Sequence, residues 1–113
     1  MRNKKTKFQS LLNLIQELKV TEHFYYSDAC HSWLKVSKQV LYQLGLKFTI
    51  SSYSYENNGQ IYLEEDCDAV AYLSILFSEK FQSEEYKNFA SLYLTEINCG
   101  DISTIRSFNH YSN

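Results

Sequence analysis

Residues 60–68 read QIYLEEDCD and continue directly into AVAYL at 69–73. Apolar and polar side chains alternate in the first part, with Ile61 and Leu63 on one face of an expected strand. The second part carries apolar side chains three and four positions apart, which predicts an amphipathic helix. The stretch therefore predicts a strand that passes into a helix through a junction crowded with carboxylates.

A strong turn signal, ENNG at residues 56–59, stands directly before this stretch. Asn-Gly pairs tolerate the positive φ that tight hairpin turns require. Residues 46–55 before the turn are rich in aromatic and β-branched side chains, which predicts the partner strand. A second hairpin is predicted from residues 23–27 and 32–36, which read HFYYS and SWLKV.

Helical periodicity predicts helices on both sides of these hairpins. Residues 7–19 carry one apolar stripe and follow a basic segment, residues 1–6, which we expect to be a flexible tail. Ser37 and Ser83 are placed as N-caps, because a serine hydroxyl can accept from the free amides of a first helical turn. We expect the helix after Ser83 to continue until Gly100 ends it.

These elements predict a single α+β domain with the order α-β-β-α-β-β-α-α. In this prediction the two hairpins form an antiparallel sheet packed with about four helices. We expect residues 23–98 to form the core and the helix at 7–19 to be an accessory. Residues 102–111 either add a strand or fray. A length of 113 residues and a hydrophobic content of 44% suit one domain with a modest core.

Composition argues against several classes of function. A net charge of −2 argues against direct nucleic-acid or membrane-surface binding, which needs a basic excess. Three cysteines without paired spacing do not make a disulfide framework, so we expect a reducing, cytoplasmic setting. We expect no signal peptide and no membrane span, because polar residues interrupt the apolar run that follows the basic start. No nucleophile elbow, phosphate loop or paired-cysteine motif predicts an enzyme, and no cofactor is expected.

The four carboxylates of the junction have a simple structural interpretation. Either Asp66 or Asp68 can cap the following helix, where an acidic side chain also complements the helix dipole. This interpretation explains two of the four carboxylates. It leaves Glu64 and Glu65 without a role.

A metal site or an acid–base pair is the second interpretation. Asp28 and His31 belong to the turn of the first predicted hairpin and can approach Glu64 and Asp66 there. Carboxylates with an imidazole can bind a divalent cation or exchange protons with a substrate. A metal-dependent enzyme using these four residues is therefore an alternative.

A recognition surface is the third interpretation. The carboxylates stand beside tyrosines that we expect to be exposed, so the two groups together predict an acidic and aromatic patch. Such a patch suits a partner with a groove lined by arginine and lysine, including one that normally holds nucleic-acid phosphate. The predicted binding residues are Tyr53, Tyr55, Tyr62, Glu64, Glu65, Asp66, Asp68, Asp28 and His31.

Several spaced motifs resemble a family of small, uncharacterised proteins encoded by bacteriophages, plasmids and other mobile elements. They are DxxHxWLxV at 28–36, LG at 44–45, YSY at 53–55, Gly59 and YLEEDCD at 62–68. The resemblance covers residues 25–73, and Ser37 stands where the pattern has a proline, which also suits a helix start. The resemblance implies a mobile-element origin and brings no established activity.

Mobile elements carry many small inhibitors of host defence nucleases. The favoured hypothesis is therefore a non-enzymatic protein-binding module in the bacterial cytoplasm. Its partner would be a host protein or protein–nucleic acid complex with a basic groove, as in anti-CRISPR or anti-restriction inhibition. Besides the metal-dependent enzyme, a second alternative to the favoured hypothesis is a small DNA-binding regulator. Residues 36–46 resemble the strand-to-helix element of swapped-hairpin regulators.

Overall fold

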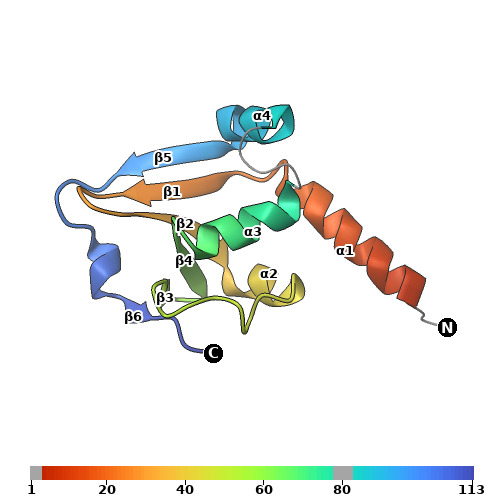
Figure 1. Ribbon diagram of the computed structural model, residues 1–113, viewed down its shortest axis with the longest axis horizontal. Coiled ribbons are helices and arrows are strands. Elements are labelled where there is room, and N and C mark those ends of the chain that lie inside the picture. The colour runs from red at the N-terminus through yellow and green to blue at the C-terminus, as the bar shows by residue number, and fades with distance from the viewer. Residues whose placement is uncertain (1–3, 78–82) are drawn as a thin grey trace.

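The computed structural model describes residues 4–77 and 83–113, and only the backbone of residues 4–6. The strands are β1 (His23–Ser27), β2 (Ser32–Ser37), β3 (Tyr55–Asn57), β4 (Gln60–Glu64), β5 (Leu94–Asn98) and β6 (Asn109–His110). The helices are α1 (Lys4–Leu18), α2 (Lys38–Gln43), α3 (Asp68–Leu76), α4 (Glu84–Tyr93) and the short 3-10 helix η2 (Thr104–Ser107). The six strands form one sheet in the order β5-β1-β2-β4-β3-β6 (Figure 1). The prediction of a small α+β domain is confirmed.

The first predicted hairpin is present in the middle of the sheet, and the second is present with a first strand, β3, that is much shorter than predicted. β1 pairs antiparallel with β2, β2 with β4, and β3 with β4. Asn58 and Gly59 at the second turn have φ values of 51° and 79°. Most residues avoid this left-handed region, and Asn and Gly are the residues that enter it most readily. The Asn-Gly signal was therefore sufficient to place this turn.

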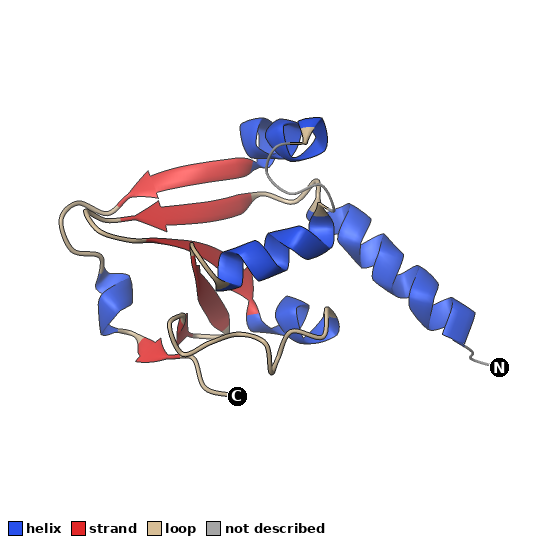
Figure 2. Cartoon of the chain, in the orientation of Figure 1, coloured by secondary structure: helices blue, strands red, loops and turns tan. Residues whose placement is uncertain are grey.

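The predicted N-caps are confirmed, while the first helix begins earlier than expected. Ser37 accepts from the Val40 N–H, and Ser83 accepts from the Tyr86 N–H. α1 begins at Lys4, so the end of the segment predicted to be a tail belongs to the helix. α1 extends away from the sheet towards the N-terminus (Figure 2).

The prediction that the last helix continues to Gly100 is wrong, because the chain leaves the helix after Tyr93. From Leu94 it enters β5, which pairs in parallel with β1. Thr95 and Ile97 are β-branched and fit an extended backbone better than a helix. Pairing with β1 also gives the backbone polar groups of this segment their partners. The sheet is therefore mixed, and the expectation of an antiparallel sheet was incorrect.

The strand predicted over residues 46–55 is also wrong for most of its length. Leu46 and Ile50 are both buried. The Ile50 N–H donates to the Leu46 carbonyl at 3.2 Å, and a bond with this spacing closes one helical turn. Beyond this turn the chain reaches the sheet only at Tyr55, where β3 begins. Residues 102–111, which we expected to add a strand or fray, contribute η2 and the two-residue strand β6.

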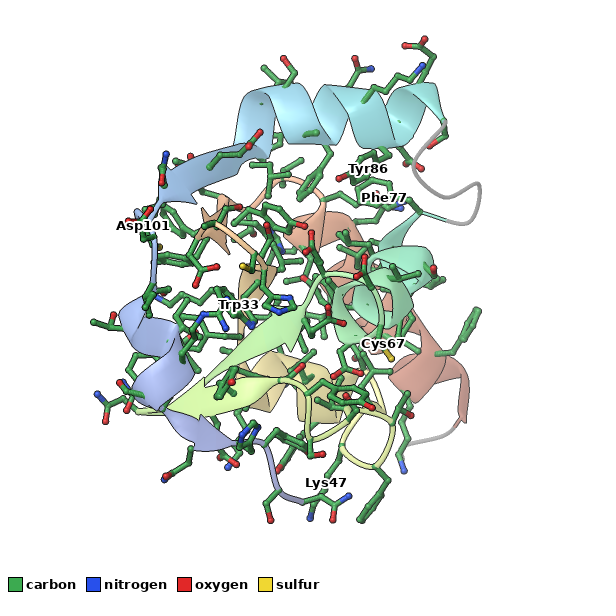
Figure 3. The ribbon with its side chains drawn as sticks, turned by 60° about the vertical axis from the view of Figure 1, so that its left-hand side comes forward. Trp33, Lys47, Cys67, Phe77, Tyr86 and Asp101 are labelled. Carbon is green, nitrogen blue, oxygen red and sulfur yellow. The ribbon has the colours of Figure 1, made fainter. Side chains whose placement is uncertain are left out.

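The two faces of the sheet have different coverings. Leu34 and Val36 of β2, with Ile61 and Leu63 of β4, belong to the main core together with side chains from all four α-helices. At the edge of this core Phe77 and Tyr86 lie close together, with ring centroids 5.5 Å apart (Figure 3).

The opposite face carries a smaller cluster built around Trp33, Tyr62 and Ile105. Tyr26, Tyr55 and Phe108 pack against it. Ile105 comes from η2, so this short helix covers part of the face.

Asp68 is buried in the first turn of α3, with 1% of its surface exposed. One carboxylate oxygen, Oδ2, accepts from the Ser51 N–H at 3.0 Å, the Ser51 hydroxyl at 2.7 Å and the Ser54 hydroxyl at 2.6 Å. The Ser54 oxygen in turn accepts from the Glu64 N–H at 2.9 Å. These bonds help to keep residues 51–54 out of a strand, since side-chain hydrogen bonds compete with strand pairing.

The capping prediction for Asp66 or Asp68 is wrong. The N-cap of α3 is Cys67, which makes no side-chain capping bond, and Asp66 is exposed. Asp68 is also not available to a partner, although we predicted it to be a binding residue. Its role is to hold residues 51–54 against α3 and β4.

Asp68→Ala is expected to lower the free energy of unfolding by about 3 kcal/mol, because it leaves the buried Ser54 hydroxyl and two donors of Ser51 without their acceptor. Urea denaturation monitored by circular dichroism measures this change. Asp66→Ala is the matched control, because it removes an exposed carboxylate two positions away and should change stability by less than about 0.5 kcal/mol. Equal losses in the two variants would contradict this role of Asp68.

Candidate functional site

A groove of about 430 Å³ opens on the sheet face that carries Trp33. Its volume is in the range of small-ligand sites, roughly 300–1,000 Å³. The groove is lined by His31, Trp33, Tyr53, Tyr55, Glu64, Asp66, Cys67, Arg106 and His110. The structure thus brings together His31, Tyr53, Tyr55, Glu64 and Asp66 from the predicted binding residues. The others, Tyr62, Glu65, Asp28 and Asp68, do not line the groove.

Aromatic rings make up much of the groove wall. Trp33 is only 2% exposed and lies at the base, edge-on to Tyr55 with ring centroids 6.2 Å apart. His110 stacks on Tyr55, with ring centroids 4.6 Å apart. Tyr53 is 71% exposed and can reach a molecule entering the groove. Trp33 belongs to the smaller cluster on this face and also lines the groove.

The acidic side of the groove carries Glu64 and Asp66. The Asp66 N–H donates to Glu64 Oε1 at 3.1 Å, which positions the Glu64 carboxylate. Neither carboxylate forms an ion pair with a lysine or arginine among the residues that the structure describes. The neighbouring Cys67 thiol has a raised pKa, caused first by the charge of Asp68 and then by burial and by Glu64. Cys67 is therefore a protonated thiol at neutral pH and a poor nucleophile.

Asp28 has a structural role that differs from its predicted role in binding. Its carboxylate accepts from Arg106 Nε at 2.6 Å and from Arg106 Nη2 at 2.9 Å, a two-point ion pair. The same carboxylate accepts from the backbone N–H groups of Cys30, His31 and Ser103, all at 3.0 Å. The Asp28 side chain is 0% exposed. It joins the β1–β2 turn to η2 and offers nothing to a ligand.

Arg106 contributes a charge to the groove that is already balanced. Its guanidinium carbon lies 5.6 Å from the centre of the Trp33 ring, which is a cation–π distance. Its Nε–H and Nη2–H groups donate to Asp28. The described charges of the groove that have no ion-pair partner are thus those of Glu64 and Asp66. The groove as a whole is aromatic and acidic.

Tyr62 and Glu65 are the remaining predicted residues that lie outside the groove. Tyr62 is 9% exposed and packs against Tyr26 and Phe108, and burial raises its pKa. The expectation that it is exposed is wrong. Glu65 accepts from the Tyr25 hydroxyl at 3.3 Å, and burial followed by the charge of Glu65 raises the pKa of Tyr25 to about 12.

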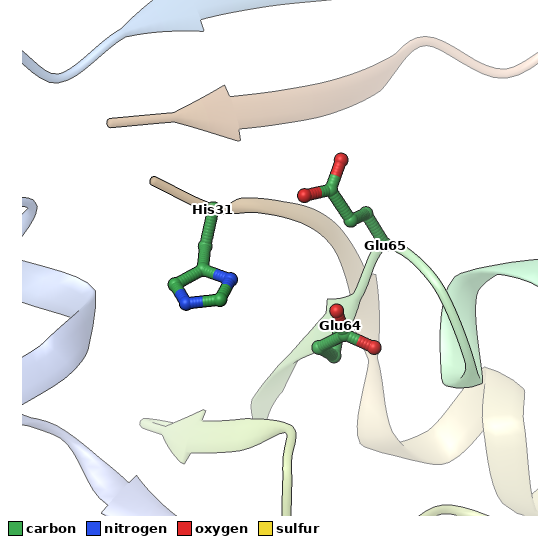
Figure 4. A group of neighbouring side chains, drawn as sticks. All are labelled: His31, Glu64 and Glu65. Carbon is green, nitrogen blue, oxygen red and sulfur yellow. The ribbon is translucent and has the colours of Figure 1, made fainter. Parts of the chain in front are cut away.

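One histidine and two glutamates come together where β2 begins and β4 ends. One nitrogen or carboxylate oxygen from each of His31, Glu64 and Glu65 lies within 4.8 Å of the others (Figure 4). Within residues 4–77 and 83–113, this is the one group of three such side chains that could hold a metal ion. Asp28 and Asp66, which we expected to join His31 and Glu64, are not part of it.

Arg106 and His110 line the groove but were not among the predicted binding residues. The Asp28–Arg106 pair joins residues 78 positions apart, and no motif spacing links them. His110 reaches the groove because its Nδ1–H donates to the Ser52 carbonyl at 2.7 Å and β6 pairs with β3. The expectation that residues 102–111 either add a strand or fray left open whether His110 reaches the sheet.

Comparisons of the chain with protein-family models, curated proteins and solved structures find no match. Among the described residues, no helix has both the length and the apolar character needed to cross a membrane.

The Asp28–Arg106 pair predicts a specific pH dependence of stability. Arg106 first, and then the backbone N–H donors, hold the pKa of Asp28 well below its usual value. A carboxyl group with a depressed folded-state pKa stabilises the fold above its unfolded pKa of about 3.9, and this contribution is lost as the pH falls. The stability difference between the wild type and Asp28→Asn should therefore shrink below about pH 4, by up to about tenfold in the unfolding constant per pH unit.

Urea denaturation of both proteins between neutral and strongly acidic pH measures this difference. Glu84→Gln provides the control, since Glu84 is exposed on α4 and should show a small difference at every pH. A gap between the wild type and Asp28→Asn that stays constant down to acidic pH would show that the pKa of Asp28 is not depressed.

Proposed function

We propose that the protein is a non-enzymatic binding module whose groove holds a cationic side chain of a partner protein. The observation that carries this proposal is the meeting of two unpaired carboxylates, Glu64 and Asp66, with the rings of Trp33, Tyr53 and Tyr55. Aromatic faces attract cations by about 0.5–2 kcal/mol, and carboxylates add a direct attraction. The groove volume of about 430 Å³ suits one or two long side chains better than a whole helix.

Arginine is the side chain that uses this combination best. Its flat guanidinium can stack on an aromatic ring while its N–H groups donate to a carboxylate. A single contact of this kind is weak, so a tight partner must also touch the surface around the groove. Tyr53 is exposed beside it and provides such a surface, and arginine and tyrosine are both frequent in binding hot spots.

Partners rich in arginine and lysine include proteins whose basic groove normally holds nucleic-acid phosphate. An acidic, aromatic surface can compete with phosphate for those side chains. Combined with the resemblance of residues 25–73 to proteins of mobile elements, this supports a role as an inhibitor of a host nucleic-acid-processing complex. Inhibition of the anti-CRISPR or anti-restriction type remains our proposal.

The rival enzyme that uses Asp28, His31, Glu64 and Asp66 has less support. Both oxygens of Asp28 are occupied by Arg106, so this carboxylate is not available to a metal or a substrate. The remaining three residues line the groove, where they equally suit cation recognition.

Titration of an acetylated, amidated hexa-arginine peptide into the protein at low ionic strength tests the proposal. The double variant Glu64→Lys/Asp66→Lys is expected to bind the peptide at least about tenfold more weakly, because two attractions are replaced by repulsions. Tyr53→Ala should weaken binding by about threefold, since it removes one exposed ring. Isothermal titration calorimetry measures all three affinities.

Glu84→Lys/Asp101→Lys is the matched control, because it makes the same change in net charge at two exposed sites outside the groove. Its affinity should stay within about twofold of the wild type. If both double variants lose affinity equally, the peptide affinity depends only on the net charge of the protein and the groove is not the binding site. A hexa-glutamine peptide should not bind.

A further inference from the structure

We propose that His31, Glu64 and Glu65 form a binding site for a divalent transition-metal ion, with Zn²⁺ as the best fit. One ligand-type atom of each residue lies within 4.8 Å of the other two. Ligands on one tetrahedral zinc ion, bonded at about 2.0–2.2 Å, lie roughly 3.4 Å apart. The ligand atoms therefore need to approach one another by up to about 1.4 Å. His31 is exposed and the glutamates are half-buried, which leaves room for this movement.

The three side chains have few competing partners. Among the described residues, neither ring nitrogen of His31 has a hydrogen-bond partner, and neither glutamate forms an ion pair. Glu64 accepts from the Asp66 N–H and Glu65 accepts from the Tyr25 hydroxyl, each through one oxygen. The second oxygen of each carboxylate remains for a cation. Two adjacent carboxylates repel each other, and a metal ion would remove this repulsion.

The backbone that carries these ligands is held on both strands. The His31 N–H donates to Asp28 Oδ1 at 3.0 Å, and its carbonyl accepts from the Asp28 N–H at 2.9 Å. The Glu65 N–H donates to the Ser32 carbonyl at 3.2 Å. The Glu64 N–H donates to the Ser54 hydroxyl, which is itself bonded to Asp68. Only side-chain rotations are left to order when the ion binds, which favours a defined site.

The ligand types select the ion. An imidazole nitrogen suits Zn²⁺ and other transition metals, whereas Mg²⁺ prefers oxygen ligands alone. Cys67 is close in sequence, but its sulfur is not in the group of three. This site does not depend on the proposed partner. Because His31 and Glu64 also line the groove, a bound ion would reduce the negative charge that the groove presents.

Calorimetric titration of ZnCl₂ into the full chain under reducing conditions tests the proposal. We expect one ion per chain, with affinity at least about tenfold weaker in His31→Gln and in Glu65→Gln, because each variant removes one ligand. Glu96→Gln removes an exposed carboxylate outside the group and should bind zinc like the wild type. Cys67→Ser should also keep the affinity, since the thiol is not a ligand.

The proposal is overturned if zinc does not bind up to millimolar concentrations, if His31→Gln binds it unchanged, or if Cys67→Ser abolishes binding. Far-UV circular dichroism verifies the fold of each variant. A second measurement needs no variant: Mn²⁺ added to the wild type should broaden the amide NMR signals of His31, Glu64 and Glu65 before all others. Broadening centred on other residues would also contradict the site.

Discussion

The buried carboxylate of Asp68 is the constraint on which the candidate site depends. A buried charge without a cation needs several donors, and Ser51 and Ser54 supply three of them to one oxygen. The Ser54 hydroxyl oxygen also accepts from the N–H of Glu64, and the Ser54 carbonyl accepts from the N–H of Tyr111 at 2.8 Å. One carboxylate thus joins α3, the end of β4, the segment that carries Tyr53 and the C-terminal residues. These segments carry several residues that line the groove, among them Tyr53, Glu64 and His110.

Local signals were enough to predict much of the fold. The Asn-Gly turn, the two serine caps and the alternation in β4 depend on neighbours in the sequence, and all of them are confirmed. The errors came from long-range partners. β5 is a strand because β1 lies beside it, and residues 51–54 stay outside the sheet because Asp68 accepts from their serines. Neither partner can be inferred from the segment itself.

The predicted binding residues also fall into two groups, those that line the groove and those that the fold uses internally. The junction was correctly identified as the place where carboxylates and tyrosines meet, and five of the predicted residues line the groove, His31, Tyr53, Tyr55, Glu64 and Asp66. Asp28 and Asp68 looked like equivalent carboxylates in the sequence, yet the fold uses both internally. Glu64 and Asp66, by contrast, line the groove and form no ion pair among the described residues. The distinction depends on Arg106 and on two serines, whose positions only the folded chain reveals.

Whether a cationic partner binds in the groove can be measured by NMR titration of ¹⁵N-labelled protein with an arginine-rich peptide. Trp33, the single tryptophan, lines the groove and gives one indole N–H signal. Binding in the groove should give saturable shifts centred on the Trp33 indole and on the amides of Tyr53, Tyr55 and Asp66. Shifts centred instead on the acidic start of α4, at Glu84 and Glu85, with an unmoved Trp33 indole, would contradict it.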